Sequence, residues 1–417
     1  MHLHRALNAA RKEKGQLLIL VALVLPLLLL FAGFAIDFGF GFLTRAELAK
    51  AADAASLAVV LNLGQGQTQA EAIGQSEFNL NYNASSPLNA QAPSVQFTPV
   101  TVNGESGIDV TATATIKTFF IRLAGFRTLT VSNFSQAVRP PVILSLVLDK
   151  SGSMKLNGGA AALPGSVTDF LGYFIQGSDQ LGEVSFSSIP TVDVAINTNF
   201  QTPITNSVNG MAFGGGTFAT GGLQDGYNEV TGVASPPANS VEVVVFFTDG
   251  WANAIQSTVG GNPEDFGGCA PEEFEPPLQW CNGVSCWNGN TGVGSGTVVN
   301  SINQGVTCDG VNSFTPTDTA ELGAGPVSLS INNIADEADY RTVQLANTMR
   351  AAGITVYSIG LGNVINQTYL QEVANDPASP VYNANEPSGL AVFAPTSSDL
   401  DSAFQTVASK ILLRLTQ

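Results

Sequence analysis

The feature that most constrains this chain is an uninterrupted apolar run near its N-terminus. Residues 17–36 read LLILVALVLPLLLLFAGFAI and contain no charged side chain. At ~1.5 Å per residue, a helix of this length spans the ~30 Å hydrocarbon core of a bilayer. A secretory signal peptide is the alternative, but its apolar region is only ~7–15 residues long and ends at a small-residue cleavage site. No such site is evident after this run, so the sequence predicts an uncleaved transmembrane helix.

The charges that flank the run predict its orientation. Arg5, Arg11, Lys12 and Lys14 lie in the N-terminal tail, residues 1–16. Because basic residues next to a transmembrane helix stay on the cytoplasmic side, the tail is expected in the cytoplasm. Everything after about residue 37 is then expected outside it.

Composition excludes several classes of function. The chain has 33 acidic and 16 basic residues, a formal charge of −17, which argues against nucleic-acid binding through a basic face. Its two histidines, His2 and His4, both lie in the N-terminal tail. Catalysis by a Ser-His-Asp or Cys-His group, and zinc bound by histidine, are therefore not expected in the main body.

Two kinds of segment follow the apolar run. Residues 43–63 lack glycine and proline and are rich in alanine, so the membrane helix is expected to continue to about residue 62. Residues 65–140 contain alternating segments rich in Val, Thr, Ile and Phe, which predict strands of a small sheet. Over residues 10–140, this order of a basic tail, an apolar run, an alanine-rich helix and strands ending in SNFSQAV resembles bacterial Flp/Tad pilus-assembly proteins of the TadE/TadG-like kind. The resemblance implies a single-pass protein of the inner membrane with a small α+β pilin-like region at residues 37–138.

A second domain is expected at residues 142–417, after the short linker Arg139-Pro140-Pro141. Apolar strand patterns alternate there with helical patterns, which is typical of an α/β fold with a doubly wound, mostly parallel, Rossmann-like sheet. The expected strands are residues 142–149, 181–188, 241–249 and 354–362, with residues 191–200 as an antiparallel edge; the expected helices lie near 160–176, 218–233, 335–352 and 397–415.

Oxygen-bearing side chains follow two of these strands. Asp149 ends one strand and is followed by Ser151 and Ser153, and Asp249 ends another; Thr217 lies on a glycine-rich loop between them. Ligands of such sheets bind outside the carboxyl ends of the strands, where the two aspartates can converge. Carboxylate and hydroxyl oxygens are hard ligands that suit a divalent cation.

The same five residues resemble the metal-ion-dependent adhesion site of a von Willebrand factor A domain, whose pattern is Asp-x-Ser-x-Ser, then Thr, then Asp. The resemblance implies a bound divalent cation, Mg²⁺ first and Ca²⁺ or Mn²⁺ as alternatives, and docking of a protein partner whose acidic residue completes the site. It implies no catalysis. A degenerate A domain without metal is one alternative. A haloacid dehalogenase-type phosphatase is another, but Ser151 stands where that enzyme needs its second aspartate as general acid.

An insertion at about residues 257–330 contains all four cysteines, Cys269, Cys281, Cys286 and Cys308. Outside the cytoplasm they are expected to form two disulfides of undetermined pairing, with a zinc site as the alternative. The tryptophans Trp251, Trp280 and Trp287 lie at the start of this stretch or within it. They are candidates for partner contact, or for packing among the loops.

Three functions follow from these patterns. The first is a membrane-anchored, extracytoplasmic assembly or adhesion protein of a Tad-type pilus that docks partners through the metal site. The second is a surface adhesin for host or matrix proteins that uses the pilus-like segment only as an anchor. The third is a metal-dependent phosphohydrolase.

Overall fold

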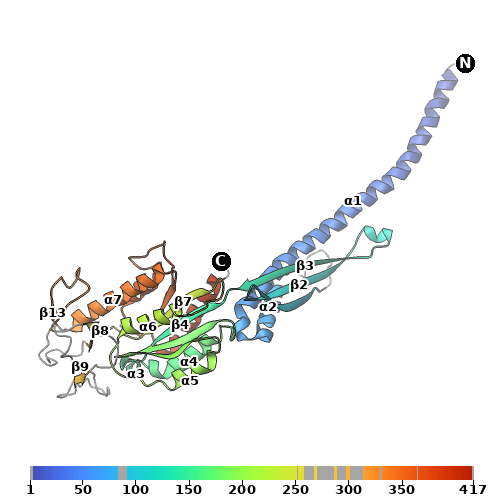
Figure 1. Cartoon of the computed structure of the whole chain (residues 1–417). Coiled ribbons are helices and arrows are strands. Elements are labelled where there is room, and N and C mark those ends of the chain that lie inside the picture. The colour runs from blue at the N-terminus through green and yellow to red at the C-terminus, as the bar shows by residue number, and fades with distance from the viewer. Residues whose placement is uncertain are drawn as a thin grey trace. The chain divides into compact units, whose positions relative to one another are not determined.

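The computed structural model describes residues 3–82, 92–250, 252–257, 267–269, 286–288, 297–300, 313–328, 331–363 and 365–415. It divides the chain into two compact units (Figure 1). The first is formed by residues up to 62 together with 66–102 and 106–138, and the second mainly by residues from 139 onward.

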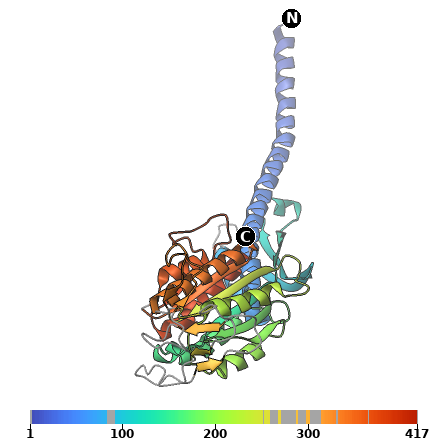
Figure 2. The same cartoon turned by 60° about the vertical axis from the view of Figure 1, so that its left-hand side comes forward.

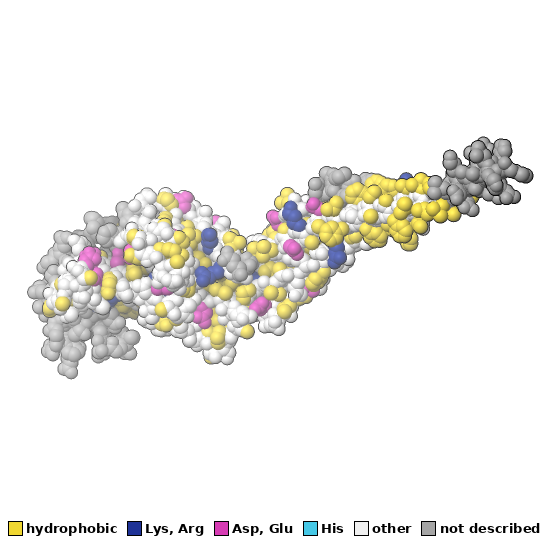
Figure 3. All heavy atoms as spheres, turned by 90° about the horizontal axis from the view of Figure 1, so that it is seen from above, with side chains coloured by type: hydrophobic (Ala, Val, Ile, Leu, Met, Phe, Trp, Pro, Cys, Tyr) yellow, Lys and Arg dark blue, Asp and Glu magenta, His cyan; other side chains and the backbone are white. Residues whose placement is uncertain are grey.

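A single long helix, α1 (Leu3–Asn62), carries the apolar run. Its end at Asn62 confirms that the apolar helix continues well beyond residue 36. Side chains of the run point outward, with Leu23 72% and Leu29 62% exposed, and they form a continuous hydrophobic surface (Figure 3). Within the described ranges, α1 is the helix long and apolar enough to cross a membrane, judged by length and composition.

The rest of the first unit contains one helix that the sequence did not predict. Residues 67–81 were expected to belong to a strand region, but they form α2 (Gln67–Asn81), which packs on α1. The expected small sheet is present with order β1-β2-β3. Its strands are β1 (Ser94–Val102), β2 (Glu105–Lys117) and β3 (Thr128–Arg139), and a short 3₁₀ helix, η2 (Ile121–Ala124), lies between the last two.

The second unit is built on a six-stranded sheet of order β15-β14-β7-β4-β5-β6. All neighbours are parallel except β6, which runs antiparallel to β5 at one edge, as predicted. The strands are β4 (Val142–Asp149), β5 (Gln180–Phe186), β6 (Pro190–Asn197), β7 (Val241–Thr248), β14 (Thr355–Leu361) and β15 (Ala391–Ala394).

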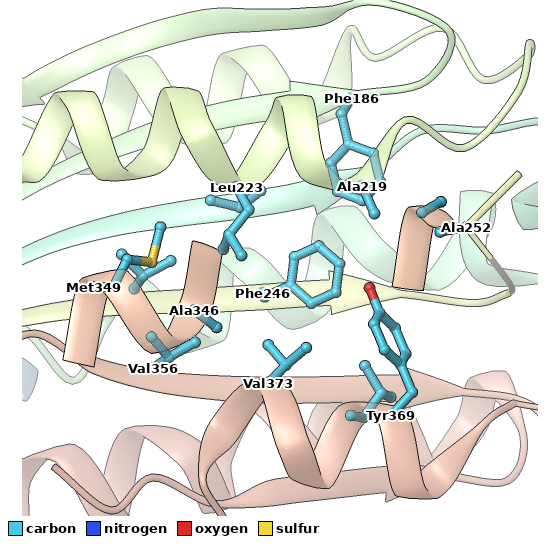
Figure 4. Close-up of a cluster of buried hydrophobic side chains, with 14 of the residues drawn as sticks. Phe186, Ala219, Leu223, Phe246, Ala252, Ala346, Met349, Val356, Tyr369 and Val373 are labelled. Atoms are coloured by element: carbon cyan, nitrogen blue, oxygen red, sulfur yellow. The ribbon is translucent and has the colours of Figure 1, made fainter. Parts of the chain in front are cut away.

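Helices cover both faces of this sheet (Figure 2). The helices of this unit are α3 (Ser153–Leu156), α4 (Gly159–Leu171), α5 (Gln201–Asn209), α6 (Ala219–Thr231), α7 (Ile331–Ala351), α8 (Gln367–Ala374) and α9 (Leu400–Arg414). A 3₁₀ helix, η1 (Leu63–Gln65), precedes α2, and another, η3 (Ser397–Asp399), precedes α9. On one face of the sheet, α6, α7 and α8 bury a hydrophobic cluster that includes Phe186, Phe246 and Met349 (Figure 4). On the other face, α4 and α9 bring the ring centroids of Phe170 and Phe404 to 5.6 Å.

The predicted linker at residues 139–141 begins with a buried residue. Arg139 is the last residue of β3 and only 1% exposed, and its guanidinium forms an ion pair with the fully buried Asp179. Asp179 also accepts the backbone N–H of Val142 at 2.9 Å. The start of β4 is therefore fixed by this buried pair.

The insertion is described only in part, as short strand pairs. These are β8 (Ala254–Ser257) with β11 (Thr297–Asn300), β9 (Gly267–Cys269) with β10 (Cys286–Asn288), and β12 (Ser313–Phe314) with β13 (Val327–Ser328). In the second pair, the backbone register places Cys269 opposite Cys286. Cys281, Cys308, Trp251 and Trp280 lie outside the described residues, as do the side chains of Cys269, Cys286 and Trp287. The disulfide and tryptophan-contact expectations therefore stay predictions.

Candidate metal-binding site

The two predicted aspartates lie at one edge of the six-stranded sheet. Asp149 is the last residue of β4, and Asp249 directly follows β7. These strands are parallel neighbours, with Leu148 opposite Phe247, so their carboxyl ends coincide. Both carboxylates are buried, with Asp149 0% and Asp249 1% exposed.

The two serines connect the aspartates through hydrogen bonds. The backbone N–H of Ser151 donates to Asp149 Oδ1 at 2.7 Å. The hydroxyl oxygens of Ser151 and Ser153 lie 3.0 Å apart, and the Ser153 hydroxyl donates to Asp249 Oδ1 at 2.7 Å. Four of the five predicted ligands therefore form one connected group of oxygen atoms.

The fifth predicted ligand, Thr217, lies on a neighbouring loop. This loop is tied to the serine loop by backbone hydrogen bonds, from Gly152 N–H to the Gly215 carbonyl at 3.1 Å and from Gly214 N–H to the Lys150 carbonyl at 2.8 Å. Gly215 has a φ of 86°, which an L side chain rarely adopts, so glycine suits this turn. Thr217 itself is 3% exposed, and its hydroxyl makes no hydrogen bond to the other four side chains in the described part of the chain.

Three further residues position the site and were not singled out from the sequence. Thr248 donates its hydroxyl hydrogen to Asp149 Oδ2 at 2.7 Å, and Asn157 donates its amide to Asp249 Oδ2 at 2.9 Å. Asn253 accepts the N–H of Thr217 at 2.6 Å and donates its own N–H back to the Thr217 carbonyl. Only Thr248, which immediately precedes an aspartate at the end of a strand, carried a signal that sequence reasoning could have used.

The electrostatics of the site favour a cation. Burial, and then the neighbouring charge of Asp249, raise the pKa of Asp149 to about 7. Burial also raises the pKa of Asp249, although hydrogen bonds from Ser153 and Asn157 oppose this. Neither carboxylate takes part in the ion pairs of the described residues. Their negative charges therefore lack a compensating cationic side chain there.

The donor set fits a hard divalent cation. Two carboxylates supply a formal charge of about −2, and neutral hydroxyls add oxygen ligands without adding charge. Asp149, Ser151, Ser153 and Asp249 can all offer oxygen atoms to a single ion, whereas structural zinc sites typically use nitrogen and sulfur ligands.

The second unit is an α/β domain with a mostly parallel six-stranded sheet, helices on both faces and polar side chains at the carboxyl ends of its strands, which is the architecture of a von Willebrand factor A domain. Residues 144–265 match the family model described as von Willebrand factor type A domain. Residues 15–62 match the model described as Flp pilus-assembly TadE/G-like. A match to a TadE/G-like model near the N-terminus and a match to an A-domain model in the second unit therefore occur in one chain. No curated protein matches the chain.

Solved structures with some likeness to the chain include proteins of pili. One is the pilus adhesin SpaC from Lactobacillus rhamnosus GG, with 16% identity, a TM-score of 0.41 and coverage of 79% of this chain and 36% of that one. Another is the vWF domain of the type V pili tip protein Mfa5 from Porphyromonas gingivalis, with 17% identity, a TM-score of 0.41 and coverage of 67% and 98%. A third is proximal thread matrix protein 1 from the mussel byssus with a zinc-occupied MIDAS motif, with 12% identity, a TM-score of 0.36 and coverage of 66% and 46%. The chain spans about a third of the length of SpaC, and likeness at this level carries nothing about what the chain binds.

Proposed function

We propose that this protein is a membrane-anchored, extracytoplasmic component of a Tad-type pilus system that docks protein partners through a divalent cation. The observation that carries the proposal is the connected group of Asp149, Ser151, Ser153 and Asp249. Two of its members are buried carboxylates that form no ion pair within the described residues. The match of residues 15–62 to the TadE/G-like model supports the pilus context. The protein acts by binding, and we assign no catalytic residue.

Mg²⁺ is the cation that the donor set suits first, and Ca²⁺ or Mn²⁺ are alternatives. Asp149, Ser151, Ser153 and Asp249 would hold it, and Thr217 would join from its adjacent loop. An ion held by few charges stays a strong Lewis acid, so it can take a carboxylate from an acidic residue of the partner. The partner chemistry that fits is therefore a protein surface with an exposed Asp or Glu.

The anchor and its flanking charges support the proposed location. The basic tail before the apolar run favours a cytoplasmic N-terminus, an inner-membrane helix and an A domain on the extracytoplasmic side. After the outer barrier is opened, protease added to right-side-out vesicles should remove the A domain and spare the first ~35 residues. Trypsin is unsuitable, because no Lys or Arg lies between Lys155 and Arg341, and a protease of broad specificity is needed. Digestion only from the cytoplasmic side would reverse the orientation.

Location also separates assembly from adhesion. Fractionation with pilus components in the inner membrane supports an assembly role, whereas exposure on the cell surface supports an adhesin for host or matrix proteins. The hydrolase alternative has no support in the geometry, since the second position of the loop is a serine whose hydroxyl faces Ser153. Metal-dependent turnover of a phosphoester by the purified protein would restore that alternative.

The decisive experiment is partner capture from crosslinked membranes with and without EDTA, using wild type, Thr217→Ala and Asp149→Ala. The Thr217 hydroxyl stands apart from the hydrogen-bonded group, so Thr217→Ala should retain Mg²⁺ within about tenfold, about 1.4 kcal/mol, yet lose most capture. Asp149→Ala should lose both metal and capture, because half of the compensating charge is removed. Capture that EDTA leaves unchanged, or that Thr217→Ala retains in full, would contradict metal-dependent docking.

A further inference from the structure

The loop that joins β2 to β3 exposes an unusual number of large apolar side chains. Its ends are closed by Thr118, whose N–H donates to the Arg127 carbonyl at 3.1 Å and whose hydroxyl donates to the Phe126 carbonyl at 2.5 Å. Between them, Leu123 is 82% exposed and Phe126 61%, and Phe119 and Phe120 are 40% and 41% exposed. Exposed large apolar side chains gathered on one loop in this way indicate an interaction surface.

One buried carboxylate fastens this loop to α1. Asp37 is 2% exposed and accepts three backbone N–H groups, those of Phe119 at 2.8 Å, Phe120 at 2.8 Å and Ile121 at 2.7 Å. Three hydrogen bonds to one ionisable side chain satisfy the amides at the start of η2. The apolar side chains of the loop are therefore presented from a fixed backbone.

Contacts along the hairpin place its tip beside the apolar run. The closer a hairpin residue lies to the tip, the nearer its contact on α1 lies to the N-terminus of that helix. Leu129 lies against Gly41, and the ring centroid of Phe119 is 5.6 Å from that of Phe40. Phe120, nearer the tip, lies against Gly33. A Cβ on Gly33 would lie 2.4 Å from the Cβ of Phe120. Gly33 is three residues inside the end of the run at Ile36, ~5 Å along the helix. Figure 1 shows the hairpin following α1 in this direction.

We propose that residues 119–126 form a second membrane-inserting element, which enters the leaflet at the C-terminal end of the apolar run beside the anchor. Lipid hydrocarbon then covers the side chains of Leu123 and Phe126. The contacts of Phe119 with Phe40 and of Phe120 with Gly33 join this loop to the apolar side of α1. The exposed cations Arg122, within the loop, and Arg127, directly after it, suit lipid phosphates. This inference rests on the proposed membrane anchor and is independent of the metal site.

The test places a photoreactive p-benzoylphenylalanine in the full chain, reconstituted in vesicles of phosphatidylethanolamine and phosphatidylglycerol. Leu123 and Phe126 are the test positions. Their matched controls are Leu80 of α2, 77% exposed, and Phe134 of β3, 58% exposed. Phe134 adjoins Ser135, whose hydroxyl is 3.1 Å from that of Ser56, a residue ~30 Å along α1 beyond Ile36.

Irradiation should give lipid adducts at the two test positions in at least about tenfold excess over the controls, because hydrocarbon surrounds only the former. Leu23→p-benzoylphenylalanine, within the apolar run, reports on the anchor itself. Adducts at Leu23 without an excess at Leu123 and Phe126 would overturn the inference and leave the anchor standing. Failure at all three positions would overturn both. Crosslinks from Leu123 to a second protein chain in place of lipid would also overturn it.

Discussion

Replacing Asp249 by asparagine tests whether the Asp149–Asp249 pair holds a cation or only stabilises the fold. The substitution is nearly isosteric and can keep both hydrogen bonds of the side chain. The amide oxygen still accepts from Asn157, and the Ser153 hydroxyl can turn to accept from the new NH₂ group. The fold is therefore expected to survive, and the change is one of charge.

Without metal, this change should not destabilise the protein above neutral pH. The pKa of Asp149 rises from 3.8 to about 7, a penalty on its ionised form of about 4 kcal/mol. Burial is the larger cause and the charge of Asp249 the second, so removing that charge should lower this penalty in part. Carboxylates with raised pKa stabilise the fold at acid pH, and that contribution is lost as pH rises through about 7. At about pH 8 Asp149 is ionised in the folded protein, and its ionisation destabilises the wild type more than the variant, which lacks the neighbouring charge.

With metal, the order of stability should reverse. A cation at about 100 times its Kd stabilises the wild type by about 2.7 kcal/mol, which raises Tm by roughly 5–10 °C for a domain of this size. Asp249→Asn loses half of the charge that compensates the ion, so its Tm should hardly change on adding Mg²⁺. The variant is then more stable than wild type in EDTA and less stable in Mg²⁺.

Scanning calorimetry of the purified full chain in detergent gives the Tm of wild type and variant, once with EDTA and once with MgCl₂. Asp376→Asn is the matched control: this carboxylate is 6% exposed and accepts the N–H groups of Ala378 and Ala391, each at 2.8 Å. It should lower Tm equally with and without metal. Equal stabilisation of wild type and Asp249→Asn by Mg²⁺ would refute the reasoning, as would a wild type that Mg²⁺ leaves unchanged.

Three further outcomes are expected. Burial raises the pKa of Glu183 to about 7, so the stability that its protonated form gives is lost as pH rises from about 4.5 through 7; Glu183→Gln should remove up to about 3 kcal/mol of this pH dependence in urea unfolding. Asp179→Ala should cost about 3–5 kcal/mol in the same assay, because it leaves the buried guanidinium of Arg139 unpaired. Gly33→Ala should displace Phe120 and lower lipid crosslinking from the β2–β3 loop, whereas Gly39→Ala, whose added Cβ would meet no atom within 4 Å, should leave it unchanged.

Much of the fold could be predicted because its signals are long. The side chains of the apolar run are exposed. Strands β4 and β14 are buried along their whole length and β7 from Val243 onward, so these patterns are clear in the sequence. Helix α2 was missed because its buried positions are Ala70, Gly74 and Phe78, of which only one is large and apolar. The edge strand β15 was missed because it has four residues. Short or weakly apolar elements are stabilised mainly by packing or pairing with neighbouring elements, so their own sequence predicts them poorly.

The candidate site was predictable only in part, for a related reason. Strand ends locate Asp149 and Asp249, since parallel strands bring their carboxyl ends to one edge. The residues that hold these carboxylates in place act through single hydrogen bonds: Asn157 lies on an exposed turn, and Asn253 follows the other strand. Such hydrogen-bond partners depend on the relative positions of two loops, and no short sequence motif predicts those positions.

Other buried carboxylates of the chain show what a structural role requires. Asp37 accepts three backbone N–H groups, and Asp179 accepts those of Val142 and Ile175 together with the guanidinium of Arg139. These donors belong to the backbone or to a permanent cation. A ligand could displace them only at the cost of leaving buried donors unpaired.

Asp149 and Asp249 are held differently. Besides the N–H of Ser151, side chains supply most of their hydrogen bonds, namely the hydroxyls of Thr248 and Ser153 and the amide of Asn157. A hydroxyl can rotate its hydrogen away and offer a lone pair, so the same oxygen that now donates to a carboxylate can become a ligand beside it. The group can thus pass from hydrogen bonding to cation binding by turning side chains, with the strands and the backbone unchanged. This is the physical reason to assign these two carboxylates to binding and the others to the fold.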